Sequence, residues 1–343
     1  MNRRKTGHTE VAVREVGPGC WTMRVEPEIF LKTPIIQHEF VCIDEGLGTL
    51  LHIHECDPAR NWRVPIGQPQ ARDLQLVGEN KILIGHHHGF TEFDLTTGRP
   101  VVEFKSLAGV TAVRRQPNGH TLIAGVNLAG VTGVGVLELD AANREVHRAL
   151  FPGDYVRLIR QTNDDTYLMC CNDRIREGSR EGKYLREFPV TGFYHAWKAL
   201  RLAGGNLLVS AGYGAFLVEL DPAGKIVRKF GGEESVPVEV HPFFYAMFQV
   251  LNNGHIVLAN WQGHGDGHGA QGIQLLEFDR RGEIVWQWSR AEMISSLQGV
   301  LVLDGLDTSQ LHDERGGMML PLVNQAGLQC NQTGDSTEAP TRL

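Results

Sequence analysis

A repeat of short apolar segments constrains this chain more than any other feature. Three stretches share one frame of glycine turn, apolar strand, variable loop, second strand and aspartate: NGHTLIAGVNLAGVTGVGVLELD at 118–140, GGNLLVSAGYGAFLVELD at 204–221, and 253–279, which begins NGHIVLAN and ends GIQLLEFD. A second turn and a further strand follow, as in DPAGKIVRKF from Asp221 and DRRGEIVWQW from Asp279. Asp-x-x-Gly between β-branched runs is typical of hairpins, because aspartate bonds its own backbone and glycine accepts a positive φ.

The spacing of the repeat predicts a closed ring of sheets. Its anchor positions are 57, 94, 140, 179, 221 and 279, with a serine in place of the aspartate at 179. Units of four strands at about forty residues predict an all-β fold, a six-bladed β-propeller of four-stranded antiparallel blades. Two packed β-sandwiches are the alternative.

The two ends of the chain bear on how the ring closes. The first unit has only three clear strands, and LQGVLVLD at 297–304 is a lone strand near the other end. We therefore expect this C-terminal strand to join the N-terminal blade, which removes exposed sheet edges. The predicted domains are a flexible N-terminus at 1–13, a single propeller domain at 14–324 and a disordered tail at 325–343.

Composition narrows the function classes. Hydrophobic residues make up 42% and charged residues 21%, as in globular proteins with a real core. The net charge is −7 and the basic residues are scattered, so neither nucleic acid nor a membrane is favoured as a partner. No run of 18 or more apolar residues follows the first arginines or occurs elsewhere, which predicts a cytoplasmic protein. The six cysteines include no CxxC pair and are expected to be reduced thiols.

The pattern NG-x-x-L-V followed by E-L-D-x-x-G-K-V-V-x-x-F resembles the repeat of quinoprotein-like and arylsulfotransferase-like propellers, over roughly residues 70–290. The resemblance rests on turn and core positions, so it implies the fold more than the function. Arylsulfotransferases of this type use a histidine near the central axis as sulfate acceptor, and this chain has no motif that assigns that role to one position.

Unusual polar and aromatic residues gather on one face of the predicted ring. In an up-and-down blade, the loops that lead into the first strand and that join the second strand to the third share a face. The NGH, GGN, DPAG and DRRG turns fall on the opposite face, where they reverse the chain. The site face collects seven of the fifteen histidines, at positions 86, 87, 88, 195, 241, 264 and 268.

This asymmetry predicts a pocket at one mouth of the propeller axis. We expect an enzyme that performs acid–base chemistry, of lyase, epimerase or hydrolase type, on a small carbohydrate-like or carboxylate substrate. The predicted catalytic residues are His195, His241, Tyr213, Tyr245, Arg157 and Lys198, the last two as anion clamps. The predicted substrate-binding residues are His87, His88, Tyr155, Asn172, Arg174, Trp197, Asn260, Trp261 and Gln262. The plan is similar to that of propeller lyases that act on uronates or open a cyclic lactone antibiotic.

A divalent metal could assist this chemistry. Its candidate ligands are His195, His241, His264 and His268, which lie on different blades or in the loop NWQGHGDGHGAQG at 260–272. HExxH, CxxC, GxGxxG followed by a helix, and GxSxG are all missing, so no nucleotide cofactor is expected. The same loop predicts a glycine-rich flap beside the pocket, with residues 260–262 as its rigid root.

Other interpretations stay open at this point. The same face could bind a protein or glycan without catalysis, with Trp197, Trp261, Tyr213 and Tyr245 as anchors. A quinone cofactor is a narrower possibility that rests on the repeat resemblance alone. The triple at 312–314 (HDE) has no predicted place and is treated as a charged turn, and the oligomeric state is unknown.

Overall fold

The computed structural model describes residues 4–6, 9–15, 21–24, 35–130 and 132–322, which fall into two compact units, Met1–Ile36 and Gln37–Leu343. The first unit contains an antiparallel sheet in the order β1-β2-β3, formed by Arg4–Thr6, Thr9–Glu15 and Trp21–Arg24. The predicted boundary between residues 13 and 14 falls inside β2, and the first compact unit runs to Ile36. The three strands satisfy their backbone by pairing with one another. The predicted tail at 325–343 lies outside the described residues.

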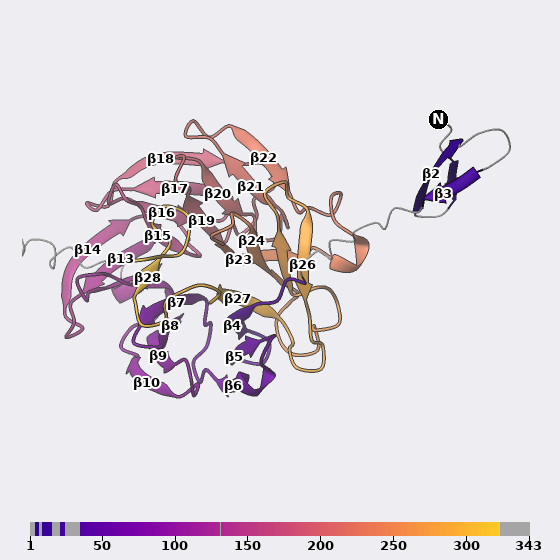
Figure 1. Cartoon of the computed structure of the whole chain (residues 1–343). Helices are drawn as coiled ribbons and strands as arrows, with labels where there is room; N and C mark the ends of the chain where they lie inside the picture. Colours follow the sequence, from indigo (N-terminus) through magenta and orange to yellow (C-terminus); the bar gives the residue numbers. More distant parts are fainter. Residues whose placement is uncertain (1–3, 7–8, 16–20, 25–34, 131, 323–343) are drawn as a thin grey trace, which may run out of the picture. The chain divides into compact units, whose positions relative to one another are not determined.

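The second unit is the predicted six-bladed propeller of four-stranded antiparallel sheets. Figure 1 shows the blades arranged around a central axis, each with its first strand innermost. Blade 1 is β27-β4-β5-β6, formed by Leu297–Val302, Glu39–Asp44, Thr49–His54 and Trp62–Pro65. The described residues contain no helix of the length and apolarity needed to cross a membrane.

The other five blades are continuous in sequence. Blade 2 is Asp73–Gly78, Lys81–His86, Gly89–Asp94 and Pro100–Phe104 (β7–β10), and blade 3 is Val110–Arg115, Thr121–Val126, Val134–Leu139 and Glu145–Phe151 (β11–β14). Blade 4 is Ile159–Gln161, Tyr167–Cys170, Arg174–Gly178 and Tyr184–Pro189 (β15–β18). Blade 5 is Lys198–Arg201, Leu207–Ser210, Leu217–Leu220 and Ile226–Phe230 (β19–β22). Blade 6 is Phe244–Val250, Ile256–Trp261, Leu275–Phe278 and Ile284–Trp288 (β23–β26).

The outer hairpins use the turn chemistry that the repeat predicts. Asp221 Oδ1 accepts the backbone N–H groups of Ala223 and Lys225, each at 2.9 Å. Ser179 takes the same place in blade 4, where its Oγ accepts from Glu181 and Lys183 at 3.2 and 3.4 Å. A hydroxyl oxygen can therefore replace the carboxylate without changing the hairpin.

Closure of the ring is confirmed, since β27 pairs antiparallel with β4 from Leu297↔Asp44 to Val302↔Phe40. Side chains of blade 1 and of blade 6 reinforce this pairing. Asp44 accepts from the backbone of Ser295 and Ser296 at 2.8 and 3.0 Å. Gln249 of blade 6 bonds both backbone groups of Val302, at 2.8 and 3.0 Å.

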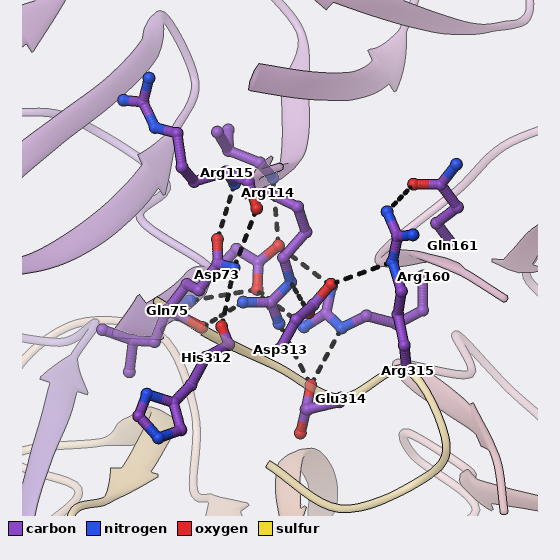
Figure 2. A network of polar contacts seen from close by, with 12 residues as sticks. Asp73, Gln75, Arg114, Arg115, Arg160, Gln161, His312, Asp313, Glu314 and Arg315 are labelled. Carbon is purple, nitrogen blue, oxygen red and sulfur yellow. Dashed lines mark hydrogen bonds and ion pairs between the residues drawn. The ribbon is translucent and has the colours of Figure 1, made fainter. Parts of the chain in front are cut away.

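The HDE triple is a plug in the central channel. β28 (His312–Asp313) pairs with β29 (Leu320–Pro321), and Gln75 of β7 donates to the His312 carbonyl at 2.9 Å. Figure 2 shows the segment reaching between the innermost strands of blades 2, 3 and 4. Glu314 Oε2 lies 3.2 Å from Arg114 Nη2 and 3.2 Å from Arg160 Nε, and its Oε1 lies 2.5 Å from Lys198 Nζ.

Charges in this axial network balance. Three buried cations, Arg114, Arg160 and Lys198, face three buried carboxylates, Asp73, Asp313 and Glu314. Burial would raise the pKa of Glu314, but the three cations outweigh it and lower that pKa to about 2. Burial, aided by the two arginines, lowers the pKa of Lys198 to about 8 in spite of Glu314. Glu314 is therefore ionised and Lys198 protonated at pH 7, and charges in such a buried site are tolerable only because each has an oppositely charged partner.

A second ionic contact fastens the closing blade to its neighbour. His38 Nδ1 lies 2.5 Å from Asp304, just past β27, and its Nε2 lies 2.9 Å from Glu277 of β25. Burial alone would lower the pKa of His38, but the bonds to Asp304 and Glu277 outweigh it and raise the pKa to about 9.

This contact predicts a pH-dependent stability. Because the pKa of His38 rises from 6.5 to about 9 on folding, its contribution is complete below pH 6.5 and is lost as the pH rises through 9. Between these values the free energy of unfolding of the wild type should fall by up to roughly 3 kcal/mol more than that of His38→Gln, as measured by urea unfolding. His120→Gln, which breaks a histidine–carboxylate pair inside blade 3, should follow the wild type. Parallel profiles for wild type and His38→Gln would contradict the assignment.

Candidate functional site

A small cavity of about 200 Å³ lies on the face that the sequence predicts. We call it the rim cavity. It is lined by Glu45, Gln70, Arg72, Arg157, Trp197, Tyr213, Phe244, Trp261, His264 and Gln298. Each of these residues leads into or begins a first strand, or lies at the connection from a second strand to a third, and five of the six blades contribute. The cavity therefore lies on the face that the strand rule marks on the sequence.

Two arginines in the rim cavity have no carboxylate partner. Arg72 and Arg157 are half-buried, and no described carboxylate oxygen comes within 4.0 Å of either guanidinium. Burial and then the charge of Arg157 lower the pKa of Arg72 to about 10, although Tyr155 and the carboxylate of Glu45 partly oppose this shift. Burial likewise lowers the pKa of Arg157. Two desolvated cations that repel each other form a site that favours an anion.

Further polar atoms of the rim cavity lack partners. Among the described residues, Arg157 Nε and Trp197 Nε1 are buried donors without an acceptor, and Gln298 Oε1 is a buried acceptor without a donor. Trp197 is 1% exposed and Gln298 is 5% exposed. Buried polar groups in proteins are normally paired, so these three atoms are a local energetic cost in the wall of the cavity.

Aromatic rings form the opposite wall. Tyr213 meets Phe244 edge to face at 4.6 Å, and Phe244 meets Trp261 at 5.4 Å. Trp261 Nε1 donates to Glu45 Oε2 at 3.2 Å, which fixes the indole in place. Such a wall gives an organic ligand an apolar surface beside the charged one.

His195 stands beside this cavity. Its Nδ1 lies 3.5 Å from Arg157 Nη2, and its ring contacts Tyr155 and Tyr213, each at a centroid distance of 5.9 Å. Partial burial and then the charge of Arg157 lower its pKa, so the imidazole is neutral at pH 7. Its φ of +57° lies in the left-handed region, a backbone cost that clusters at functional sites.

Several predicted site residues are placed in structural roles. Lys198 is committed to Glu314 and to the Phe248 carbonyl, both at 2.5 Å, so its ammonium belongs to the axial network. Tyr245 is fully buried and its hydroxyl donates to the Gly231 carbonyl at 2.5 Å. Burial raises the pKa of this phenol well above its ordinary value.

The residues at the root of the flap, 260–262, are held by hydrogen bonds from two of their side chains to the neighbouring segment. Asn260 donates to the carbonyls of Val240, His241 and Ile273, and its oxygen accepts from Phe243. Gln262 Oε1 bonds His241 Nδ1 at 2.8 Å. These two amides therefore hold the segment that leads into blade 6. Of residues 260–262, only Trp261 lines the rim cavity.

The remaining predicted binding residues are spread around the same face. His87 Nδ1 bonds Gln70 Oε1, which lines the rim cavity, at 3.2 Å. His88 Nδ1 bonds the Leu107 carbonyl at 3.2 Å. Asn172 is exposed, and Arg174 pairs with Asp173 and Glu187 on the outer part of blade 4.

The predicted metal ligands do not fit a metal. His264 Nδ1 bonds Glu45 at 3.0 Å, and His268 Nε2 bonds the His264 carbonyl at 2.9 Å. His241 is exposed and bonded to Gln262, while His195 faces a cation. No group of three or more histidine, cysteine or acidic side chains within the described ranges is arranged to hold a metal ion. We therefore derive no step through a metal.

The sequence interpretation missed Arg72, Glu45, Gln70, Phe244 and Gln298. A signal for the first and third was available, since GQPQARDLQ at 67–75 leads into the first strand of blade 2 and obeys the same face rule. Arg72 is informative because it lacks a carboxylate partner, and nothing in the sequence shows that property.

A larger cavity of about 660 Å³ lies at the opposite end, lined in part by Gln116, Glu138, Gln161, Arg180 and Arg315. Its cations have partners: Arg180 pairs with Glu138 at 2.6 Å, and Arg315 bonds Gln116 and Gln161 and lies 3.6 Å from Asp313.

Comparisons with known proteins support the fold. No protein-family model matches the chain, and no curated protein matches it. Among solved structures, a protein of unknown function from Bacteroides caccae is 22% identical over 78% of this chain and 99% of its own, with a TM-score of 0.64. The WD40 β-propeller domain of Doa1 is 11% identical over 75% of this chain and 80% of its own, with a TM-score of 0.50.

A catalytically inactive virginiamycin B lyase from Staphylococcus aureus, determined with quinupristin, is 11% identical over 76% of this chain and 87% of its own, at a TM-score of 0.49. At this level of similarity it carries no argument about the site. The match to the Doa1 domain supports a β-propeller and does not distinguish the superfamily that the repeat resembles.

The contrast between Arg157 and Arg160 is testable. Arg160→Met should lower the free energy of unfolding by about 3 kcal/mol or more, because it leaves Asp73 and Glu314 short of a partner. Arg157→Met, three residues earlier, leaves no carboxylate unpaired and should cost less than about 1 kcal/mol. Urea unfolding followed by tryptophan fluorescence measures both. Equal losses would mean that Arg157 is structural.

Proposed function

We propose that the rim cavity binds a small carboxylate-bearing molecule and that the chain is an enzyme with acid–base chemistry at this site. One observation carries the binding proposal: Arg72 and Arg157 face the same small cavity without a carboxylate partner in the described chain. A planar guanidinium suits a carboxylate because its N–H groups match the two oxygens. A cavity of about 200 Å³ suits a small molecule and not a polymer.

The buried indole N–H of Trp197 strengthens this proposal. It has no acceptor among the described residues, and Arg157 lies over the Trp197 ring with its Cζ 5.4 Å from the centroid. A bound anion would cancel the repulsion between the two guanidinium groups.

His195 is the residue to which we assign proton transfer. A neutral imidazole can take the proton from the carbon next to the carboxylate, while the electron pair of the broken C–H bond moves into an enolate that Arg72 and Arg157 stabilise. His195 Nδ1 faces Arg157 in the structure and becomes available when that guanidinium turns to the carboxylate. Elimination and epimerisation both begin with this step.

A second candidate function is non-catalytic binding of a protein or glycan through the same face. It is favoured by exposed aromatic side chains on the rim, since Tyr194 is 59% exposed, Tyr213 39% and Phe243 38%. Such rings are common anchors at binding surfaces. The two functions differ in whether a bound carboxylate is changed.

Binding can be tested with benzoate as ligand. Benzoate should raise the melting temperature of the wild type, since a ligand at a hundred times its dissociation constant contributes about 2.7 kcal/mol. Arg157→Met and Arg72→Met should each lose most of this shift, whereas Arg99→Met, an exposed arginine of blade 2, should keep it. A shift that is equal in all four proteins would overturn the anion site.

Catalysis can be tested by deuterium exchange. In D₂O the wild type should replace the hydrogen next to the carboxylate in members of a panel of small carboxylates, as followed by proton NMR. His195→Asn should slow this exchange by a hundredfold or more, within the usual range for a general base. His147→Asn, on the outer strand of blade 3, should exchange at the wild-type rate. Binding without exchange in the wild type would favour the non-catalytic function.

A further inference from the structure

Exposed aromatic rings continue from the rim cavity onto the surface of the propeller. Tyr213 lines the cavity and is also 39% exposed, so it belongs to both. The centroid of its ring lies 5.5 Å from that of Tyr194 and 5.8 Å from that of Phe243, which are 59% and 38% exposed. We call Tyr194, Tyr213 and Phe243 the aromatic shelf. Contiguous exposed apolar surface of this kind marks interaction sites.

Backbone contacts hold the aromatic shelf in place. Tyr213 donates its backbone N–H to the Tyr194 carbonyl at 2.9 Å, and Phe243 donates to Asn260 Oδ1 at 3.0 Å. Between the two tyrosines, Gly212 has a φ of +63°, and a Cβ there would lie 2.2 Å from the His195 carbonyl oxygen. Glycine is therefore required for these segments to meet, and the exposed rings stand on a backbone that is fixed before any ligand arrives.

The mouth of the rim cavity has one apolar edge. Its exposed lining residues are Gln70, Tyr213 and His264, which therefore surround the mouth. Gln70 bonds His87 and His264 bonds Glu45, so these two edges are polar. The cavity of about 200 Å³ is smaller than the roughly 300–1,000 Å³ of most small-molecule pockets. An apolar body that does not fit inside would leave over Tyr213 and meet the aromatic shelf.

The geometry of the aromatic shelf suits a further aromatic ring. Tyr213 meets Phe243 at an interplanar angle of 87° and His195 at 69°. Rings that meet edge to face present both faces and edges to a ligand, and aromatic pairs favour such arrangements. The three shelf side chains bring neither a carboxylate nor a cation, so only the two arginines of the cavity attract the anionic end of a ligand.

We propose that the aromatic shelf is an outer subsite of the rim cavity and that the ligand is a carboxylate with at least two rings. Its carboxylate binds Arg72 and Arg157, its first ring lies in the cavity beside Tyr213, and its second ring packs on Tyr194 and Phe243. This proposal rests on the anion site of the preceding section. It adds selection by length and assigns the exposed rings to the small ligand instead of a protein or glycan.

The test compares benzoate with biphenyl-3-carboxylate and biphenyl-4-carboxylate. All three share the carboxylate and the first ring, and the two biphenyls carry the second ring in different directions. Dissociation constants are measured by calorimetry on the full chain. At least one biphenyl should bind the wild type about tenfold more tightly than benzoate, the gain expected from burying part of one more ring.

Tyr194→Ala and Phe243→Ala should each reduce this gain to about threefold or less, because each removes one ring of the shelf. Benzoate should bind both variants as it binds the wild type, since neither side chain lines the rim cavity. Tyr184→Ala, a tyrosine that is 36% exposed on the outer strand β18 of blade 4, is the matched control and should keep the full gain. The two shelf variants are independent, so one that fails to fold leaves the other to decide.

Two results would overturn the outer subsite and leave the anion site standing. One is equal affinity of the wild type for benzoate and both biphenyls, and the other is a gain that both shelf variants retain, in each case with benzoate binding still lost in Arg157→Met. Benzoate binding that is absent from the wild type, or unchanged in Arg157→Met, would overturn both proposals.

Discussion

The propeller depends on how it neutralises charge along its axis. First strands of neighbouring blades bring Arg114, Arg160 and Lys198 into a region where each is at most 2% to 5% exposed. Isolated cations there would be very costly, and Asp73 alone cannot balance them. Asp313 and Glu314 supply the missing charge from a segment that follows the last blade. Ring closure and channel filling are thus achieved by the same C-terminal stretch, since β27 closes blade 1 just before the chain enters the channel.

The same physical rule distinguishes two nearby arginines, Arg160 within β15 and Arg157 two residues before it. Arg160 has two carboxylate partners and bonds to Asp73 at 2.8 and 3.1 Å, so its charge is fully used inside the fold. Arg157 lies over two aromatic rings, makes one long contact with a histidine, and leaves Nε unpaired. Its stacking on Tyr155 and Trp197 recovers part of the desolvation cost, on the order of 1 kcal/mol each. The remainder is a cost that an anionic ligand would offset.

The repeat allowed most of the fold to be predicted because its information is local. Turn residues such as Asp221 and the apolar strands between them specify hairpins by short-range chemistry, and the closing strand follows from a missing partner in the first unit. Lys198 shows where this approach ends. The sequence placed Lys198 on the site face. Its partner, Glu314, lies 116 residues further along the chain, in a segment with no repeat pattern, so the sequence could not identify this ion pair. Such long-range ion pairs determine whether a charged side chain is available to a ligand, and the sequence repeat does not show them.

Two sets of contacts hold the rim cavity, one through the axial network and one through the flap at 260–272. Arg72 and Trp197 directly precede Asp73 and Lys198, so this part of the cavity is covalently continuous with the axial network. The flap is held by contacts of a different kind: Ser295 Oγ donates to the Gly265 carbonyl at 2.6 Å, and a Cβ on Gly269 would lie 2.3 Å from the Ile294 carbonyl. Glycine at 269 is therefore required for the flap to approach the segment before β27, the strand that carries Gln298. A carboxylate bound by Arg157 would lie beside His195, whose Nδ1 is 3.5 Å from Arg157 Nη2, so the axial charges that stabilise the fold would also position the proposed reaction.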